Sequence, residues 1–177
     1  MEATMKKLFV IFALMTVAAL TFAQKAGEKI SFKSVTLDGK AISDSMFAKN
    51  KITMINIWGT FCPPCIGEMP DLAKLNEANK DKGVEVVGVI IDLVDDDGKI
   101  LPQAKADADD IISQTGAYYT HIVPTEDMYD DGALLSNIQA VPTTFFINSE
   151  GKIVGKIYMG AKSQKDWQKI IDNLLKK

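Results

Sequence analysis

The chain has 177 residues, a length that fits one domain with a short additional segment. Hydrophobic residues make up 47% of it and charged residues 24%, which is typical of a globular protein with a sizeable core. The formal net charge is −3 and no Lys/Arg-rich patch stands out, so nucleic acid is not expected as a partner.

The first residues have the pattern of an export signal. Lys6-Lys7 precedes an apolar or small stretch that ends in Thr21-Phe22-Ala23, with small residues at the two positions that a signal peptidase reads. The stretch is short for a transmembrane helix, which needs about 20 residues. We therefore expect a signal peptide over residues 1–23 and a domain over residues 24–177 that folds outside the cytoplasm, for example in the periplasm. An uncleaved membrane anchor is the alternative.

In the first half of the domain, two segments have the character of buried strands. Residues 52–58 and 84–91 are apolar and rich in β-branched side chains, as in strands that are covered on both faces. Before them, residues 30–37 lead into the turn-like Asp38-Gly39-Lys40, which predicts a strand that enters a hairpin. A helix to about residue 80 is predicted by apolar residues at helical spacing, namely Met69, Leu72, Leu75 and Ala78.

The second half begins with an acidic, turn-rich loop over residues 92–99. Residues 102–115 predict a helix, with Pro102 near its start and Gly116 after its end. The other predicted elements are a strand over 118–123, a helix over 128–138, paired strands over 143–148 and 153–159, and an amphipathic helix over 162–175. This order predicts an α/β fold, a central mixed sheet flanked by helices on both faces, with an N-terminal β-hairpin and a helical insertion over 92–116.

The chain has two cysteines, three residues apart in Cys62-Pro63-Pro64-Cys65. A structural disulfide stabilises more when it closes a long loop, and this pair closes almost none. In an oxidising compartment the spacing therefore favours a redox pair. Half of a zinc site and an inert disulfide are the alternatives, although zinc usually takes four ligands.

The motif stands between a predicted strand and a predicted helix, which indicates how such a pair would work. A helix N-terminus stabilises a thiolate through unpaired N–H groups and its positive partial charge, and the thiolate is the nucleophile. We expect Cys62 to be exposed at the helix start and to attack, and Cys65, one turn further and shielded, to resolve the mixed disulfide. Pro63 and Pro64 have no N–H to offer, so a less stabilised Cys62 thiolate should make the couple more reducing.

The segment Trp58-Gly59-Thr60-Phe61-Cys62-Pro63-Pro64-Cys65 resembles the active site of the thioredoxin superfamily, and is most similar to its exported TlpA/ResA branch. Three further positions agree with this resemblance. Pro70 stands where thioredoxin-like proteins kink the active-site helix, Val141-Pro142-Thr143 resembles the family's cis-proline loop, and Glu68 matches a glutamate characteristic of the exported reductants. The match covers most of the chain after the signal, but residues 92–114 depart from it in length and sequence.

The resemblance implies roles for individual residues. Cytoplasmic thioredoxin has a buried aspartate that accepts the proton of the second cysteine, and here Asn56 stands in its place and cannot do so. We expect Glu68 to take the role, since residues three apart share a helix face and burial would raise its pKa. The alternative for Glu68 is a carboxylate that complements the helix dipole. Substrate contacts are expected from Trp58, Pro63, Pro64, Val141 and Pro142. For Trp58 and for Phe61, packing and substrate contact are equal alternatives.

The implied activity is reduction of protein disulfides outside the cytoplasm by dithiol–disulfide exchange. The expected partners are protein substrates that contain disulfides and a membrane electron donor that reduces the enzyme again. Members of the resembled branch serve cytochrome c maturation, so an apocytochrome is one candidate client. The expected cofactor is none beyond the redox-active Cys62–Cys65 disulfide, no metal is expected, and the protein should be a monomer.

Two other functions use the same fold. A peroxiredoxin-like peroxide reductase would have a Pro-x-x-x-Thr-x-x-Cys setting, but Ile55 and Gly59 hold the proline and threonine positions. A non-enzymatic copper-delivery module would favour a Cys-x-x-x-Cys pair with a distant histidine, for which His121 is the candidate. We expect His121 to be structural or at the surface. The run Asp95-Asp96-Asp97-Gly98 lacks the terminal glutamate of a calcium loop and is interpreted as a solvated turn.

Overall fold

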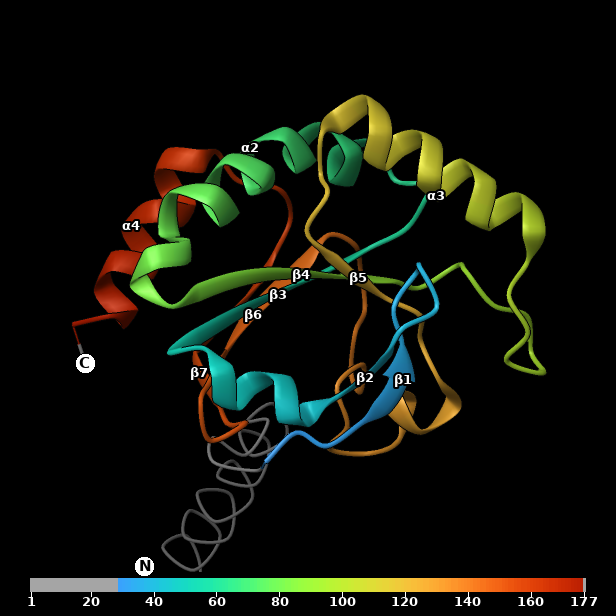
Figure 1. Ribbon diagram of the computed structural model, residues 1–177, viewed down its shortest axis with the longest axis horizontal. Helices are drawn as coiled ribbons and strands as arrows, with labels where there is room; N and C mark the ends of the chain where they lie inside the picture. The colour runs from blue at the N-terminus through green and yellow to red at the C-terminus, as the bar shows by residue number, and fades with distance from the viewer. Residues whose placement is uncertain (1–28, 177) are drawn as a thin grey trace, which may run out of the picture.

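The computed structural model describes residues 29–176, so the predicted signal peptide over residues 1–23 lies outside the described part of the chain. A mixed five-stranded sheet in the order β5-β4-β3-β6-β7 forms its centre, and two further strands form an N-terminal hairpin (Figure 1). The strands are β1 (Lys33–Val35), β2 (Ala41–Ser43), β3 (Ile52–Trp58), β4 (Val84–Ile90), β5 (Thr120–Ile122), β6 (Thr143–Asn148) and β7 (Ile153–Met159). The α-helices are α2 (Pro63–Asn79), α3 (Pro102–Thr115) and α4 (Gln164–Leu174), and the 3₁₀ helices are η1 (Asp44–Lys49), η2 (Lys80–Lys82) and η3 (Glu126–Tyr129).

β3 occupies the middle of the sheet, a position that its largely apolar sequence favours. Every one of its residues is therefore buried. It pairs in parallel with β4 and antiparallel with β6, as expected when a helix connects the first pair. In this register Asn56 lies opposite Gly88 on one side and Thr144 on the other. A single amide side chain therefore lies at the centre of an otherwise largely apolar strand.

The helices cover the sheet as layers (Figure 1). One face is covered by α2, α3 and α4, through core residues such as Leu72, Ile112 and Trp167. The opposite face is covered by η1, η3 and the N-terminal segment, through residues such as Phe47 and Met128. The predicted fold class, with helices on both faces of a mixed sheet, is confirmed.

The predicted helix over residues 128–138 is wrong. The structure has only the short helix η3 here, followed by turns. Gly132 at φ 80° and Asn137 at φ 62° adopt left-handed conformations that a right-handed helix cannot contain. Leu134 and Leu135 are nevertheless buried against the sheet, so the apolar spacing correctly indicated burial but not the backbone conformation.

The other elements agree with the predictions except at their ends. The first predicted strand, 30–37, is reduced to β1, and the last helix begins at Gln164 because the Ser163 side chain caps it by accepting the Asp166 N–H. α3 has Pro102 in its first turn and ends at Gly116, which is left-handed at φ 69°. The helical insertion is thus confirmed.

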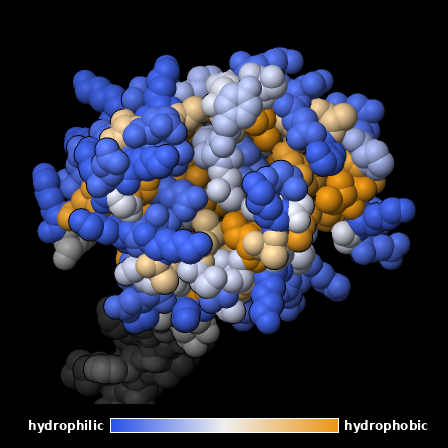
Figure 2. Space-filling model, viewed as in Figure 1, coloured by the Kyte–Doolittle hydropathy of each residue, from blue (hydrophilic) through white to orange (hydrophobic). Residues whose placement is uncertain are grey.

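The β1–β2 hairpin lies against the outer edge of β5. The Leu37 N–H donates to the His121 carbonyl at 2.8 Å, and the Val123 N–H donates to the Val35 carbonyl at 3.0 Å. In Figure 2 the visible face is largely hydrophilic, with apolar side chains gathered between the helical layer and this hairpin. Within residues 29–176, no helix combines the length and the apolar character needed to cross a bilayer.

Candidate active site

Cys62 and Cys65 form a disulfide at the N-terminus of α2. Cys62 is the capping residue of the helix, and its Sγ accepts a hydrogen bond of 3.3 Å from the Cys65 N–H. Cys65 is fully buried, as predicted. Cys62 was expected to be exposed, but only 5% of its surface is accessible, because its sulfur is turned toward the helix while Phe61, Pro63 and Pro64 take the surface positions.

The loop that precedes Cys62 is held by the segment that follows β4. The Thr60 N–H donates to both carboxylate oxygens of Asp92 at 3.1 Å, and the Thr60 hydroxyl donates to Oδ2 at 2.5 Å. The Ile91 N–H also donates to the Trp58 carbonyl at 3.0 Å. Asp92 is a site residue that the sequence analysis missed, since it was included in the acidic, turn-rich loop over residues 92–99. Its position directly after a strand parallel to β3 was the available signal, because parallel strands end at the same edge of a sheet.

Glu68 lies beneath the motif on α2, with 4% of its surface exposed. Three donors reach its carboxylate: Asn56 Nδ2 to Oε1 at 2.9 Å, the Lys162 backbone N–H to Oε2 at 3.1 Å, and Trp167 Nε1 to Oε2 at 3.3 Å. Burial raises the pKa of Glu68 above the usual glutamate value, and the hydrogen bonds only partly oppose this effect. A buried carboxyl with a raised pKa can exchange protons near neutral pH.

Asn56 connects Glu68 to the strand that follows the proline loop. Its Nδ2 donates to Glu68 Oε1 and also to Thr144 Oγ1, the latter at 3.1 Å. The peptide bond between Val141 and Pro142 is cis, as the resemblance implied, and the Pro142 carbonyl accepts the Gly160 N–H at 2.8 Å. Motif, carboxylate and proline loop thus come together at one end of the sheet.

The residues predicted to contact substrate are distributed unevenly. Pro63 and Pro64 are exposed and Val141 is half-buried, whereas Pro142 is buried. Trp58 was predicted as a substrate contact, but it is fully buried and its Nε1 donates to His121 Nδ1 at 3.3 Å, so its packing alternative fits the structure. Phe61, beside the disulfide, is 64% exposed and offers an apolar surface, so its alternative as a substrate contact fits the structure better than packing does.

Comparison with known proteins shows the family to which the chain belongs. A family model described as Redoxin matches residues 23–174. The chain belongs to the Redoxin family. The redoxin is 28% identical to the thiol-disulfide oxidoreductase ResA of Halalkalibacterium halodurans over 144 residues, which are 79% of this chain and 72% of that protein. It is 32% identical to a ResA of Bacillus cereus over 133 residues, covering 73% and 67% of the two chains.

A solved structure agrees with these relatives. The crystal structure of a thiol:disulfide interchange protein of the thioredoxin family from Chlorobium tepidum is 26% identical, with a TM-score of 0.66, and the match covers 85% of this chain and 97% of that one. This redoxin is therefore a ResA-like thiol-disulfide oxidoreductase whose CXXC pair is Cys62–Cys65. Within residues 29–176, no group of three or more His, Cys, Asp or Glu side chains is arranged to hold a metal ion.

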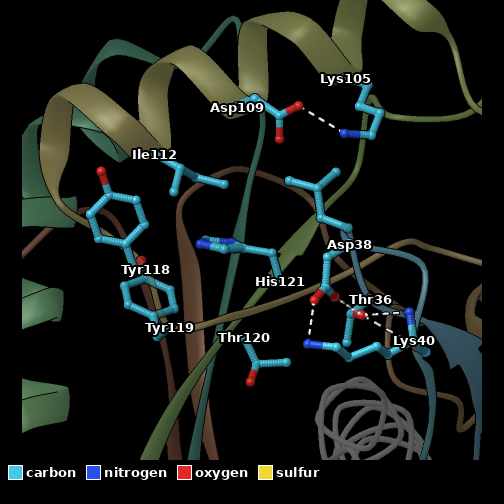
Figure 3. Close-up of a pocket in the computed structure, with 11 residues that line it drawn as sticks. Thr36, Asp38, Lys40, Lys105, Asp109, Ile112, Tyr118, Tyr119, Thr120 and His121 are labelled. Carbon is cyan, nitrogen blue, oxygen red and sulfur yellow. Dashed lines mark hydrogen bonds and ion pairs between the residues drawn. The ribbon is translucent and has the colours of Figure 1, made fainter.

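His121 lies on β5, at the wall of a pocket between α3 and the turn of the β1–β2 hairpin (Figure 3). The residue is 5% exposed, and its ring lies between Trp58 and Tyr119. Nδ1 accepts the Trp58 N–H, so Nε2 carries the proton and donates to the Ala117 carbonyl at 2.8 Å. Gly88 makes room for this arrangement, because a methyl group there would overlap both rings. The expectation of a structural histidine fits these contacts.

We predict that His121 makes this redoxin sensitive to acid. Burial lowers the pKa of His121 from 6.5 to about 4 in the folded protein, since the charged ring would lose its solvation and could not accept the Trp58 N–H. Its contribution to stability is therefore complete above pH 6.5 and is lost as the pH falls through about 4, a change of about 3 kcal/mol. Chemical unfolding between pH 7 and 4 would measure it, with His121→Gln as the neutral comparison. Parallel losses in both proteins would contradict the assignment.

Proposed function

We propose that this redoxin reduces disulfides in protein substrates outside the cytoplasm. The observation that carries the proposal is the buried Glu68 carboxylate, three residues after the shielded Cys65 on the same helix. Such a group serves the release step of a dithiol reductant, in which the second thiol must lose a proton inside the protein. Export is supported by the signal-like pattern of residues 1–23.

The proposed reaction transfers two electrons to the substrate disulfide. The Cys62 thiolate attacks one substrate sulfur, forming a mixed disulfide and releasing the other sulfur as a thiolate. Glu68 accepts the proton of the Cys65 thiol, and the Cys65 thiolate then attacks Cys62 Sγ. The Cys62–Cys65 bond forms as the bond between Cys62 and the substrate breaks, and the second substrate sulfur leaves as a thiolate. The oxidised protein must then receive two electrons from a donor, for which we propose a membrane carrier.

The direction follows from how little stabilises the Cys62 thiolate. The described residues provide one N–H donor to Cys62 Sγ, that of Cys65, and neither Pro63 nor Pro64 has an N–H. A weakly stabilised thiolate makes the dithiol a stronger reductant. We further propose that an extended client segment, such as that of an apocytochrome, lies along Val141–Pro142 beside the exposed Phe61.

The reduction potential tests this direction. Equilibration with a glutathione buffer should give a value near that of thioredoxin, about −270 mV, because the thiolate has few donors. The variant Pro64→His, which adds a possible donor and cation to the motif, should be more oxidising than the wild type. A wild-type value near the −120 mV or so of DsbA would overturn the reductant assignment.

A further inference from the structure

Asn56, on the strand that leads to the redox pair, has an acceptor without a partner among the described residues. Its side chain is fully buried, and both hydrogen bonds that it makes use Nδ2 as the donor, to Glu68 and to Thr144. Asn56 Oδ1 has no hydrogen-bond partner among the described residues, although it is completely shielded. Buried polar atoms of native proteins are rarely left in this state, and each case calls for an explanation.

The unused acceptor faces the same core as Cys65. Alternate residues of a strand point to the same side of a sheet, and the neighbours of Asn56 at that spacing, Met54 and Trp58, pack in the cluster that contains Cys65. Asn56 is also bound to Glu68, which shares a face of α2 with Cys65. In the oxidised protein Cys65 carries no hydrogen, whereas reduction gives it an S–H donor in a fully buried position.

We infer that Asn56 Oδ1 accepts the S–H of Cys65 when the protein is in the dithiol form. The acceptor is empty in the disulfide form because its donor does not exist there. One amide would then touch both groups of the release step, with Oδ1 on the Cys65 thiol and Nδ2 on the Glu68 carboxylate. An amide cannot take up the proton, so Asn56 is a positioning residue that fixes the thiol next to its base. This inference rests on the proposed function, since it deepens the step assigned to Glu68.

The S–H stretching band in the infrared spectrum reports this hydrogen bond directly. The chain has two cysteines, so the full-length variant Cys62→Ser, kept reduced, has a single S–H band that belongs to Cys65. We expect the frequency of a hydrogen-bonded thiol in this background. Adding Asn56→Leu, which has a similar shape and no acceptor, should raise the band to the frequency of a free thiol. Adding Asn56→Asp, which keeps an acceptor oxygen, should leave the band at the hydrogen-bonded frequency or lower it.

Thr144→Val is the matched control, because it removes the other partner of Asn56 without touching Oδ1. Its band should equal that of the parent, which separates a specific bond from a general disturbance of the core. If Asn56→Leu does not fold, the S–H band of Asn56→Asp still tests the inference. A free-thiol frequency in Asn56→Asp would contradict it. A free-thiol frequency in the Cys62→Ser parent would overturn it outright.

The function of Glu68 is tested separately, by the rate at which Cys65 releases substrate in Glu68→Gln. A hydrogen-bonded Cys65 band with an unchanged release rate would support the role of Asn56 and reject that of Glu68. A free-thiol band with a slowed release rate would do the reverse.

Discussion

Replacing Glu68 with glutamine is expected to slow the release of substrate by about 10²-fold, a typical loss when a general acid–base group is removed. Cys65 would have to lose its proton without a base in a position where neither thiol nor thiolate meets bulk water. The first step, attack by Cys62, should be almost unaffected because Glu68 lies on the side of Cys65. The substitution therefore separates the two halves of the reaction.

Single-turnover kinetics would measure this effect. The reduced protein is mixed with a chromophoric disulfide, so that the first released thiol reports attack by Cys62 and the second reports resolution by Cys65. Glu77→Gln is the matched control, since Glu77 lies on the same helix but is exposed. Equal resolution rates in the wild type and Glu68→Gln across pH 6 to 9 would remove Glu68 from the mechanism.

The same substitution should make the protein more stable at neutral pH. Burial raises the pKa of Glu68 in the folded state, so its contribution to stability is complete below pH 4.5 and is lost as the pH rises through the folded-state pKa. Each tenfold strengthening of proton binding corresponds to about 1.4 kcal/mol. The advantage of Glu68→Gln in unfolding free energy should thus grow from pH 4.5 upward. Opposite effects on stability and rate would show that the buried carboxyl is retained for its chemistry.

Replacing Cys65 with serine should convert the enzyme into a trap. Cys62 would still attack, but no second thiol would release the mixed disulfide, so client proteins should remain covalently bound. We expect that the Cys65→Ser protein, recovered from its native compartment, carries adducts that disappear on treatment with a reductant. Their identities would name the clients directly.

Two controls make the trap specific. Cys62→Ser should carry no adducts, because Cys65 is fully buried and cannot reach a client disulfide. The double variant reports background attachment, since the chain has no other cysteine. Adducts of equal yield on Cys62→Ser would reverse the assignment of attacking and resolving residues.

Most of the fold could be predicted because the sequences of its central strands and helices indicate which residues are buried and where the elements end. β3 and β4 are largely apolar and rich in β-branched residues, and α3 is bounded by Pro102 and Gly116. The helix predicted over residues 128–138 is wrong because apolar side chains can reach the core from turns as well as from a helix, so their spacing does not distinguish the two. The spacing of apolar residues indicates which side chains are buried. It does not indicate that a residue such as Asn137 adopts a left-handed conformation, which ends a right-handed helix.

The site was predictable where it is local and not where it depends on distant contacts. That Cys62, Cys65 and Glu68 lie close together follows from their spacing of three residues at the start of one helix. The donors to Glu68 from α4 and the loop before it come from residues 94 and 99 positions away, and the partner of Trp58 is 63 positions away. No local pattern specifies such pairs, so the bond between Trp58 and His121 and the donors to Glu68 had to come from the structure.

The hairpin against β5 has a consequence for how the enzyme meets extended protein segments. An extended segment carries unpaired backbone that adds readily to any open edge of a sheet. Here β1 and the turn after it cover the outer edge of β5, because Leu37 donates to His121 and Val123 donates to Val35. The register shift between β6 and β7, near the left-handed Gly155, distorts the opposite edge. Neither edge of the sheet presents a long, flat strand, so pairing of another chain with these edges is disfavoured. In the proposed reaction a protein substrate would then be held mainly by the mixed disulfide with Cys62, which Cys65 can break, so that each encounter can end in release.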